Sequence, residues 1–169
     1  MKSAKRGEMR TFLAILLGLL WLAPTICRGQ TKCPWLNEAT ARGVLGGAVT
    51  GNVKTVAHGD GVCEFSRKEG AALHELRIAV AIMTDMPKQF PGYLAQCSSS
   101  TPLRAIGNEA VTCSLQKKGD YSEKVVGRVR EQAFVVSISS SVQDDPSLTP
   151  EMRREKVHLV AEQVAGILF

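Results

Sequence analysis

Several signatures of common protein functions are missing from this 169-residue chain. Its three histidines are far apart and form no H-x-x-x-H or H-E-x-x-H pair, so the sequence predicts no metal site. It has no G-x-S-x-G and no phosphate-binding glycine loop, so nothing indicates a serine hydrolase or a nucleotide-binding protein. Aromatic residues make up only 5% of the chain, too few for the stacking platform of a single-strand nucleic-acid binder. No cofactor is predicted.

An apolar run near the start is too short to span a bilayer and predicts a secretory signal peptide. It covers residues 11–24 and follows a group of basic residues, Lys2, Lys5, Arg6 and Arg10. Small residues at the −3 and −1 positions place the cleavage site after Gly29. We therefore expect a signal peptide at 1–29 and a single domain at 30–169, with no further run long enough to cross a membrane.

The positive charge of the chain is concentrated in the expected signal peptide. The whole sequence carries a formal net charge of +5, with 21 Lys and Arg residues against 16 Asp and Glu residues. Five of the basic residues and one of the acidic residues lie in 1–29, so the expected domain is close to neutral, at about +1. The basic balance therefore reflects export and indicates no nucleic-acid partner.

Cys27 leaves a membrane-anchored alternative open, because it closely follows the apolar run, as the lipid-modified cysteine of a lipoprotein does. Residues 24–26 are Pro-Thr-Ile, whereas a lipoprotein signal needs a small residue just ahead of the cysteine. We therefore expect a periplasmic or extracellular protein without a lipid anchor.

Four cysteines follow the expected cleavage site, and an even number in an exported chain indicates two disulfides. Of the three possible pairings we favour Cys33–Cys63 and Cys97–Cys113, which join neighbours in sequence and tie each helix-like segment to the strand after it. Each bridge would contribute about 3–4 kcal/mol in the chain-entropy model. A thiol redox site or a metal site is the alternative, although the chain contains no C-x-x-C.

A short helix is predicted within residues 35–47. Asn37 is a good N-cap, and Gly46 ends the apolar periodicity as glycine commonly does at a helix C-terminus. Trp35 and Leu36 precede the cap, and we expect them to staple the helix entry into the core rather than form a contact site.

Two further helices are predicted later in the chain. The first is short, at 88–97, with Pro91 in its first turn. The second begins after a Thr149 cap and follows a linker at 144–150. Its buried stripe has the i, i+3, i+4 spacing of an amphipathic helix: Val157, Val160, Ala161, Val164 and Leu168.

Alternation of apolar and polar residues predicts the strands, most clearly at 76–82, where every second residue is apolar. Further strands are expected at 49–57, 62–65 and 110–115, and residues 124–140 are predicted to form a hairpin that turns near 131–132. The order is helix, strands, helix, strands, helix. This order predicts an α+β fold, in which two short helices and an amphipathic C-terminal helix pack on an antiparallel sheet.

Candidate catalytic groups are few and scattered. His74 is expected near the core edge at the start of the long strand, Glu75 follows it, and Glu109 lies in a glycine turn. The serine runs at 98–100 and 139–141 fit loops or strand ends better than nucleophiles. Of the other titratable candidates, His58 fits a turn, His158 fits the last helix, and the pair Asp144–Asp145 fits a linker before a proline. We assign no catalytic and no metal-binding residue.

Basic residues cluster in the sequence of the expected hairpin region, interrupted by glutamates. We interpret them as a solvated sheet face rather than as a site for an anionic partner. They are Lys117, Lys118, Lys124, Arg128 and Arg130.

Three short motifs carry a resemblance to a known group of proteins: Cys33-Pro34-Trp35-Leu36, Cys63-Glu64-Phe65 and Gly107-Asn108-Glu109-Ala110. With the hairpin and the C-terminal helix, they make residues 33–169 resemble small exported bacterial proteins of unknown function. The best-known relatives are actinobacterial lipoproteins with a PsbP-like α/β fold. The resemblance implies a curved antiparallel sheet with flanking helices, a Cys33–Cys63 bridge and no shared catalytic residue. The chain departs from that pattern in its poor lipid-anchor box.

These observations together predict an exported, non-enzymatic binding or accessory module that contacts an envelope protein or a small ligand. One alternative is an envelope enzyme whose site is assembled from distant residues, with His74, Glu75 or Glu109 as candidates. The other alternative is a thiol redox protein, which requires free cysteines.

Overall fold

The computed structural model describes residues 32–55 and 59–169, and these form one seven-stranded sheet and three helices. All neighbouring strands are antiparallel, in the order β1-β2-β3-β7-β6-β5-β4. The strands are β1 Thr50–Thr55, β2 Gly61–Glu69, β3 Ala72–Ile82, β4 Thr101–Leu103, β5 Glu109–Lys117, β6 Asp120–Val129 and β7 Gln132–Ser140. The expected α+β class with an antiparallel sheet is confirmed.

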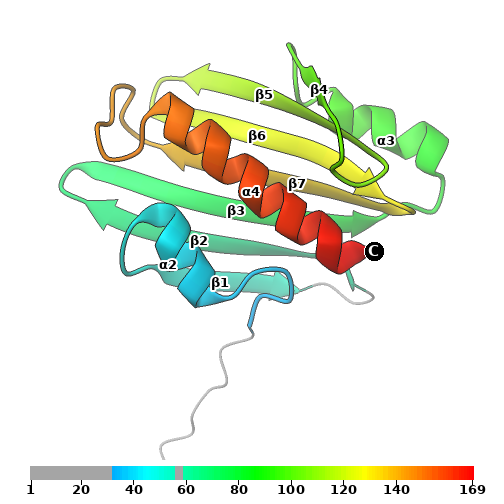
Figure 1. Cartoon of the computed structure of the whole chain (residues 1–169), viewed down its shortest axis with the longest axis horizontal. Helices are drawn as coiled ribbons and strands as arrows, with labels where there is room; N and C mark the ends of the chain where they lie inside the picture. The colour runs from blue at the N-terminus through cyan, green and yellow to red at the C-terminus, as the bar shows by residue number, and fades with distance from the viewer. Residues whose placement is uncertain (1–31, 56–58) are drawn as a thin grey trace, which may run out of the picture. The chain divides into compact units, whose positions relative to one another are not determined.

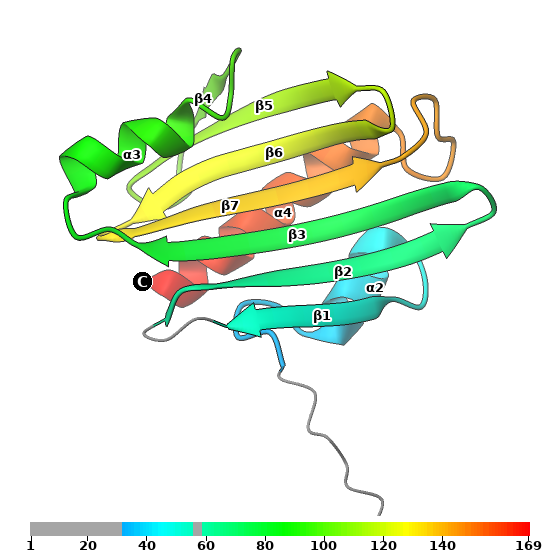
Figure 2. The same ribbon diagram turned by 180° about the vertical axis from the view of Figure 1, so that it is seen from behind.

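The helices lie on opposite faces of the sheet. Helix α4 (Pro150–Leu168) contacts β6 and β7, and α2 (Glu38–Leu45) contacts β2 and β3 on the same face (Figure 1). Helix α3 (Met86–Leu94) lies on the other side, near one end of β6 (Figure 2). The expected packing of the C-terminal helix on the sheet is confirmed. We call the side opposite α2 and α4 the open face, because α3 covers only one end of it among the described elements.

The main core lies between the sheet and the pair α2 and α4. Trp35 and Leu36 are buried in it, as the staple predicts. The alternation predicted for 76–82 is present, since Leu76, Ile78 and Val80 all point into this core. Its other buried members include Leu45, Phe65, Val125, Phe134, Val136, Ile138, Val157, Val160, Ala161 and Val164.

The helix starts follow the predicted caps, with one correction. The side chain of Asn37 accepts a hydrogen bond from the backbone N–H of Thr40 at 2.8 Å, and Thr149 caps α4 in the same way. The first-turn position predicted for Pro91 is wrong: α3 begins at Met86, so Pro87 occupies the first turn and Pro91 lies inside the helix. A proline there has no N–H to donate, which removes one intrahelical hydrogen bond and shortens the regular part of α3.

Two strand predictions also need correction. The predicted hairpin is present as β6 and β7, but it turns at 130–131, one residue earlier than expected. Arg130 adopts a positive φ of 53°, and its N–H donates to the side chain of Asn108 at 2.6 Å. Strand β4 was not predicted, because it is three residues long and contains Pro102. Such a strand is set by pairing with β5 rather than by its own pattern.

The four cysteines are paired as favoured from the sequence. Cys33 and Cys63 have Cα atoms 5.8 Å apart, and Cys97 and Cys113 have Cα atoms 5.6 Å apart. Cys63 is buried on the helix-covered face, whereas Cys113 lies on the open-face side of β5, opposite Lys124. Because Cys97 follows α3, the second bridge fastens α3 to the open face.

Some expectations concern the part of the chain outside 32–55 and 59–169. The signal peptide at 1–29, the cleavage after Gly29, the alternative anchor at Cys27 and the turn containing His58 all lie outside the described residues. Within the described ranges, no helix is both long and apolar enough to cross a bilayer.

Candidate functional site

A block of polar side chains occupies the centre of the open face. Strand β7 lies between β3 and β6, and the register aligns their open-face residues in two rows across the three strands. One row is Glu75, Ser139 and Ser122, and the next row is Arg77, Ser137 and Lys124. We call these six residues the polar array.

The polar array lines a shallow recess with a volume of about 290 Å³. The recess is completed by Leu73, Gly119, Asp120 and Ser141, from the adjoining strand ends and from the β5–β6 turn. Its volume is at the lower end of what small-molecule sites enclose, so it suits a ligand of about one ring. The small serine side chains on the middle strand produce the hollow, because larger residues there would fill it.

Several polar groups of the array lack a partner within the described part of the chain. Ser122 is only 4% exposed, and its hydroxyl oxygen makes no hydrogen bond there. A buried hydroxyl without a partner costs about 1–3 kcal/mol. Lys124 lies next to it along β6, and among the described residues no carboxylate forms an ion pair with its ammonium group. The ammonium group of Lys124, which is only partly buried, is therefore available to a ligand in the recess.

The charges of the recess are separated along the strands. The carboxyl groups of Glu75 and Asp120 lie toward one end, and the cations of Arg77 and Lys124 lie toward the other. Burial raises the pKa of Glu75, and the nearby carboxylate of Glu64 raises it further, while Arg77 opposes the shift. The recess therefore has an acidic end and a basic end.

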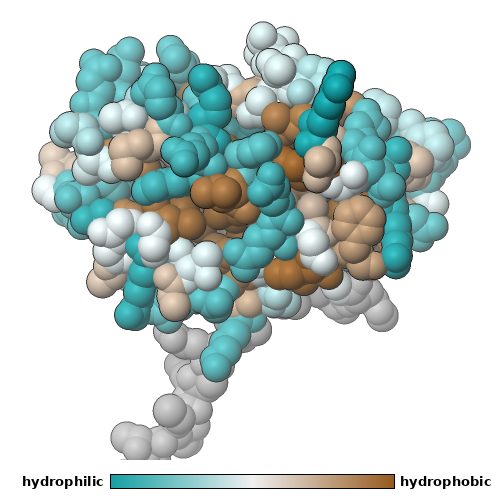
Figure 3. All heavy atoms as spheres, in the orientation of Figure 1, coloured by the Kyte–Doolittle hydropathy of each residue, from teal (hydrophilic) through white to brown (hydrophobic). Residues whose placement is uncertain are grey.

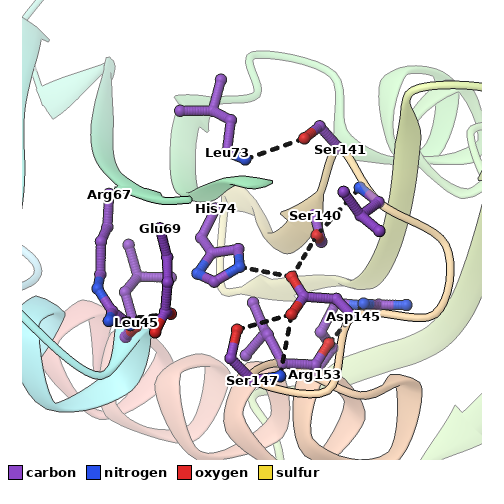
Figure 4. A network of polar contacts seen from close by, with 12 residues as sticks. Leu45, Arg67, Glu69, Leu73, His74, Ser140, Ser141, Asp145, Ser147 and Arg153 are labelled. Atoms are coloured by element: carbon purple, nitrogen blue, oxygen red, sulfur yellow. Dashed lines mark hydrogen bonds and ion pairs between the residues drawn. The ribbon is translucent and has the colours of Figure 1, made fainter. Parts of the chain in front are cut away.

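A second polar cluster, centred on the buried side chain of Asp145, lies at the opposite end of β3 from α3. His74 on β3 lies beside Ser140 on β7, and both contact the same carboxylate oxygen of Asp145 (Figure 4). The distances are 2.5 Å from His74 Nε2 and 2.7 Å from Ser140 Oγ to Asp145 Oδ2. The other carboxylate oxygen accepts from the hydroxyl and the backbone N–H of Ser147, at 2.6 and 2.9 Å. Asp145 thereby holds the β7–α4 connection against the sheet.

The hydrogen bonds decide the charge state of Asp145. Burial alone raises the pKa of a carboxyl group, but the bonds from Ser147, Ser140 and His74 together hold the pKa of Asp145 well below its usual range. The carboxylate is therefore the stable form, and it satisfies donors that would otherwise be buried without a partner.

This cluster contains the residue types of a hydrolytic triad but not its geometry. A triad needs the serine bonded to the histidine and the histidine bonded to the acid, in series. Here Ser140 and His74 both bond to the acid, no bond between them is present in the described structure, and both are 0% exposed. The cluster is suited to stabilising the fold, because the side chains of His74 and Ser140 are not accessible to a substrate.

The structure does not bring the three candidate catalytic residues together. His74 and Glu75 are consecutive on β3, so their side chains point to opposite faces of the sheet. Glu109 lies on β5, three strands away from β3, where it forms an ion pair with Arg128 at 3.3 Å. His158 lies on α4, 3.9 Å from Glu162. In the ranges 32–55 and 59–169, no three His, Cys, Asp or Glu side chains are grouped as a metal site would require.

The basic residues of the hairpin region are dispersed rather than gathered. Lys124 belongs to the polar array, whereas the guanidinium of Arg128 lies over the ring of Phe90 on α3, 5.7 Å from its centre. Lys118 lies in the β5–β6 turn and Arg130 in the β6–β7 turn. Lys124 therefore differs from the other basic residues of this region, because it lines the recess and is not simply part of a solvated sheet face.

A larger concavity, of about 450 Å³, lies between α2 and α4 and is mainly apolar. Figure 3 shows hydrophobic surface between these two helices. Lys156 on α4 crosses it and donates to the backbone carbonyl of Val44 at 2.6 Å, and burial lowers the pKa of Lys156. The ammonium group of Lys156 therefore already has a hydrogen-bond acceptor, whereas Lys124 in the open-face recess has no ion-pair partner among the described residues.

Most of the polar array was not predicted from the sequence. Glu75 was considered only as a catalytic group, Lys124 only as one of several basic residues, and Ser139 only as part of a strand-end run. Arg77, Ser122 and Ser137 were not considered as site residues. A usable signal was present, because Glu75 and Arg77 occupy alternate positions in a strand whose other face is apolar.

No family model, curated protein or solved structure matches the chain.

Proposed function

We propose that the expected mature chain is an exported, non-enzymatic binding module that holds a small polar ligand on its open face. The observation that supports this most directly is the recess itself, where serines and charged side chains from β3, β7 and β6 line one hollow of about 290 Å³. One of its cations, Lys124, forms no ion pair within the described residues, so an anionic group of a ligand could bind to it.

The construction of the sheet also supports a binding role. One face is filled by aliphatic and aromatic side chains under α2 and α4, whereas the middle of the other face carries serines and charged residues. A face with only a solubility function needs no recess, and long charged side chains would serve it better than Ser137 and Ser139. The rigid sheet holds each polar group at a fixed position, which lowers the entropy cost of binding.

The proposed location rests on the cysteines and on the sequence pattern of 1–29. Two disulfides are consistent with an oxidising compartment, where such bonds persist. We therefore propose a periplasmic or extracellular protein. Membership in the PsbP-like group of exported proteins stays a proposal that rests on the three short motifs and on the α+β arrangement.

The proposal is tested with the purified, oxidised domain of residues 30–169 and a panel of sugars, sugar acids, amino acids, nucleosides and short peptides. Binding is read as a thermal shift together with slower hydrogen exchange in β3, β6 and β7. We expect at least one class to bind to the wild-type protein, and Ser137→Leu to abolish the effect by filling the recess.

The matched control is Ser99→Leu, which makes the same change at an exposed position between α3 and β4, outside the recess. It should bind like the wild type. A ligand that binds equally well to Ser137→Leu, or a panel that gives no response, would contradict the proposed binding face.

A further inference from the structure

The positions of the charges in the recess restrict the chemistry of its ligand. Along β3, Glu75 and Arg77 are two residues apart, which separates them by about 6.6–6.8 Å along the strand. On β6 the order is the same: the acidic residue, Asp120, comes before the basic residue, Lys124. Because β3 and β6 both run antiparallel to β7, their acidic ends coincide at one end of the recess.

The width of the recess lets both cations contact one group. Strands β3 and β6 are separated by β7, so Arg77 and Lys124 are attached about 9–10 Å apart, at two strand spacings. Their side chains are long enough to meet above Ser137, the residue directly between them in the register. An anionic group placed there would receive charge-assisted hydrogen bonds from both sides.

Serine hydroxyls connect the two charged ends. Ser137 and Ser139 lie on the middle strand, and Ser122 lies directly opposite Ser139. Each hydroxyl can donate one hydrogen bond and accept others, so this row suits a ligand that carries hydroxyl groups between its charges.

We propose that the recess binds a zwitterionic, hydroxylated ligand about the size of one sugar ring. The anionic group lies over Ser137 between Arg77 and Lys124, the cationic group lies toward Glu75 and Asp120, and hydroxyls bond to the serines. This inference rests on the proposed function and names the ligand class for the same site.

The balance of charges favours a zwitterion over a simple ion. The recess has two acidic and two basic side chains, so a ligand that is only anionic would approach two carboxylates that it cannot satisfy. A ligand that is only cationic would approach two cations, Arg77 and Lys124, that repel it. Glu64 already contacts Arg77 at 3.3 Å, which leaves Lys124 as the cation with the most unsatisfied charge. Burial and the nearby carboxylate of Glu64 raise the pKa of Glu75 and so disfavour its charged form. A ligand cation beside Glu75 would favour the carboxylate.

Three pyranose probes that differ in charge test the inference on the oxidised 30–169 domain. Muramic acid carries an amine and a carboxylate, glucuronic acid carries only the carboxylate, and glucosamine carries only the amine. Calorimetric titration should show muramic acid binding about tenfold more tightly than either of the other two, since each charged contact contributes on the order of one decade.

Variants at the two ends of the recess assign the contacts. Lys124→Gln should weaken muramic acid about tenfold but should not weaken glucosamine, which loses a repelling charge. Glu75→Gln should reduce muramic acid to the affinity of glucuronic acid. Lys54→Gln removes an exposed cation from the edge strand β1, outside the recess, and should change nothing. Arg77→Gln provides a second variant at the basic end in case Lys124→Gln does not fold.

The outcomes separate this inference from the proposed function. Equal binding of muramic and glucuronic acid, or equal binding of muramic acid and glucosamine, overturns the zwitterion. No binding of any of the three probes overturns the ligand class. In either case the proposed function is still decided by the panel and by the comparison of Ser137→Leu with Ser99→Leu.

Discussion

At the scale of single residues, Asp145 illustrates how a polar group that looks like part of a loop can hold a fold together. Its carboxylate accepts hydrogen bonds from His74, Ser140 and Ser147, at distances of 2.5 to 2.9 Å. The first two donors are 0% exposed, so removing the acceptor leaves them buried without a partner.

We therefore expect Asp145→Asn to lower the free energy of unfolding by about 2–4 kcal/mol at pH 7. Urea unfolding measures the change. Asp144→Asn is the matched control, because its side chain is exposed one residue earlier and should leave stability within about 0.5 kcal/mol of the wild type.

The same residue predicts a dependence on acid. The pKa of Asp145 is lower in the folded protein than its ordinary unfolded value of about 3.9, so the unfolded chain takes up the proton first. Its stabilisation is complete above about pH 4 and is lost as the pH falls below that value. The difference between wild type and Asp145→Asn should therefore shrink from pH 7 to pH 3. An equal difference at both pH values would contradict the assignment of the charge to Asp145.

Gly127 is a second residue whose identity is set by its neighbours. A Cβ atom at this position would overlap the ring of Phe134 and approach the Cβ of Ala110 to 3.1 Å. Phe134 is fully buried and cannot move away, so we expect Gly127→Ala to destabilise the domain by about 1–3 kcal/mol in urea unfolding. Gly43→Ala in α2 is the control, because a Cβ there meets no described atom within 4 Å, and it should be neutral or slightly stabilising.

At the scale of elements, helix α3 depends on one covalent tie. It packs on the open face through a small cluster around Phe90 and Met83, separate from the main core. The bridge from Cys97 to Cys113 fastens its C-terminal end to β5. A helix of nine residues with an internal proline has little stability of its own.

We therefore expect the double variant Cys97→Ser/Cys113→Ser to increase hydrogen exchange in α3 while β3 and β7 stay protected. Its loss of global stability should be about 3–4 kcal/mol or less. Uniform loss of protection across the sheet would show instead that α3 and the main core unfold as one unit.

The elements also show what local pattern can and cannot predict. The alternation at 76–82 predicted β3 and its buried face, and the Asn37 and Thr149 signals predicted two helix starts, because these features depend on nearby residues. The polar array was not predictable to the same degree. It requires β7 to lie between β3 and β6, and strand order follows from pairing between distant segments. The contact of His74 with Asp145 likewise joins residues 71 positions apart.

At the scale of the whole molecule, the two faces of the sheet have different roles. The face under α2 and α4 supplies the apolar core, and the open face presents the polar array. Each face carries one disulfide, because Cys63 is buried under the helices and Cys113 lies on the other side. The bridges therefore constrain both faces of the sheet. Together they contribute to the free energy of unfolding of the whole domain and not only to the stability of one helix or strand.

The stability of the whole fold should depend on oxidation of its cysteines. Two bridges at about 3–4 kcal/mol each amount to about 6–8 kcal/mol, a large part of the 5–15 kcal/mol by which domains of this size are usually stable. We expect reduction to shift the urea midpoint strongly downward and to leave the chain close to unfolding, which would tie correct folding to an oxidising compartment. The measurement compares oxidised and reduced 30–169 domain, with alkylation and peptide mapping to verify the thiol state. An unchanged midpoint on full reduction would mean that the core alone maintains the fold and that the cysteines give no support to export.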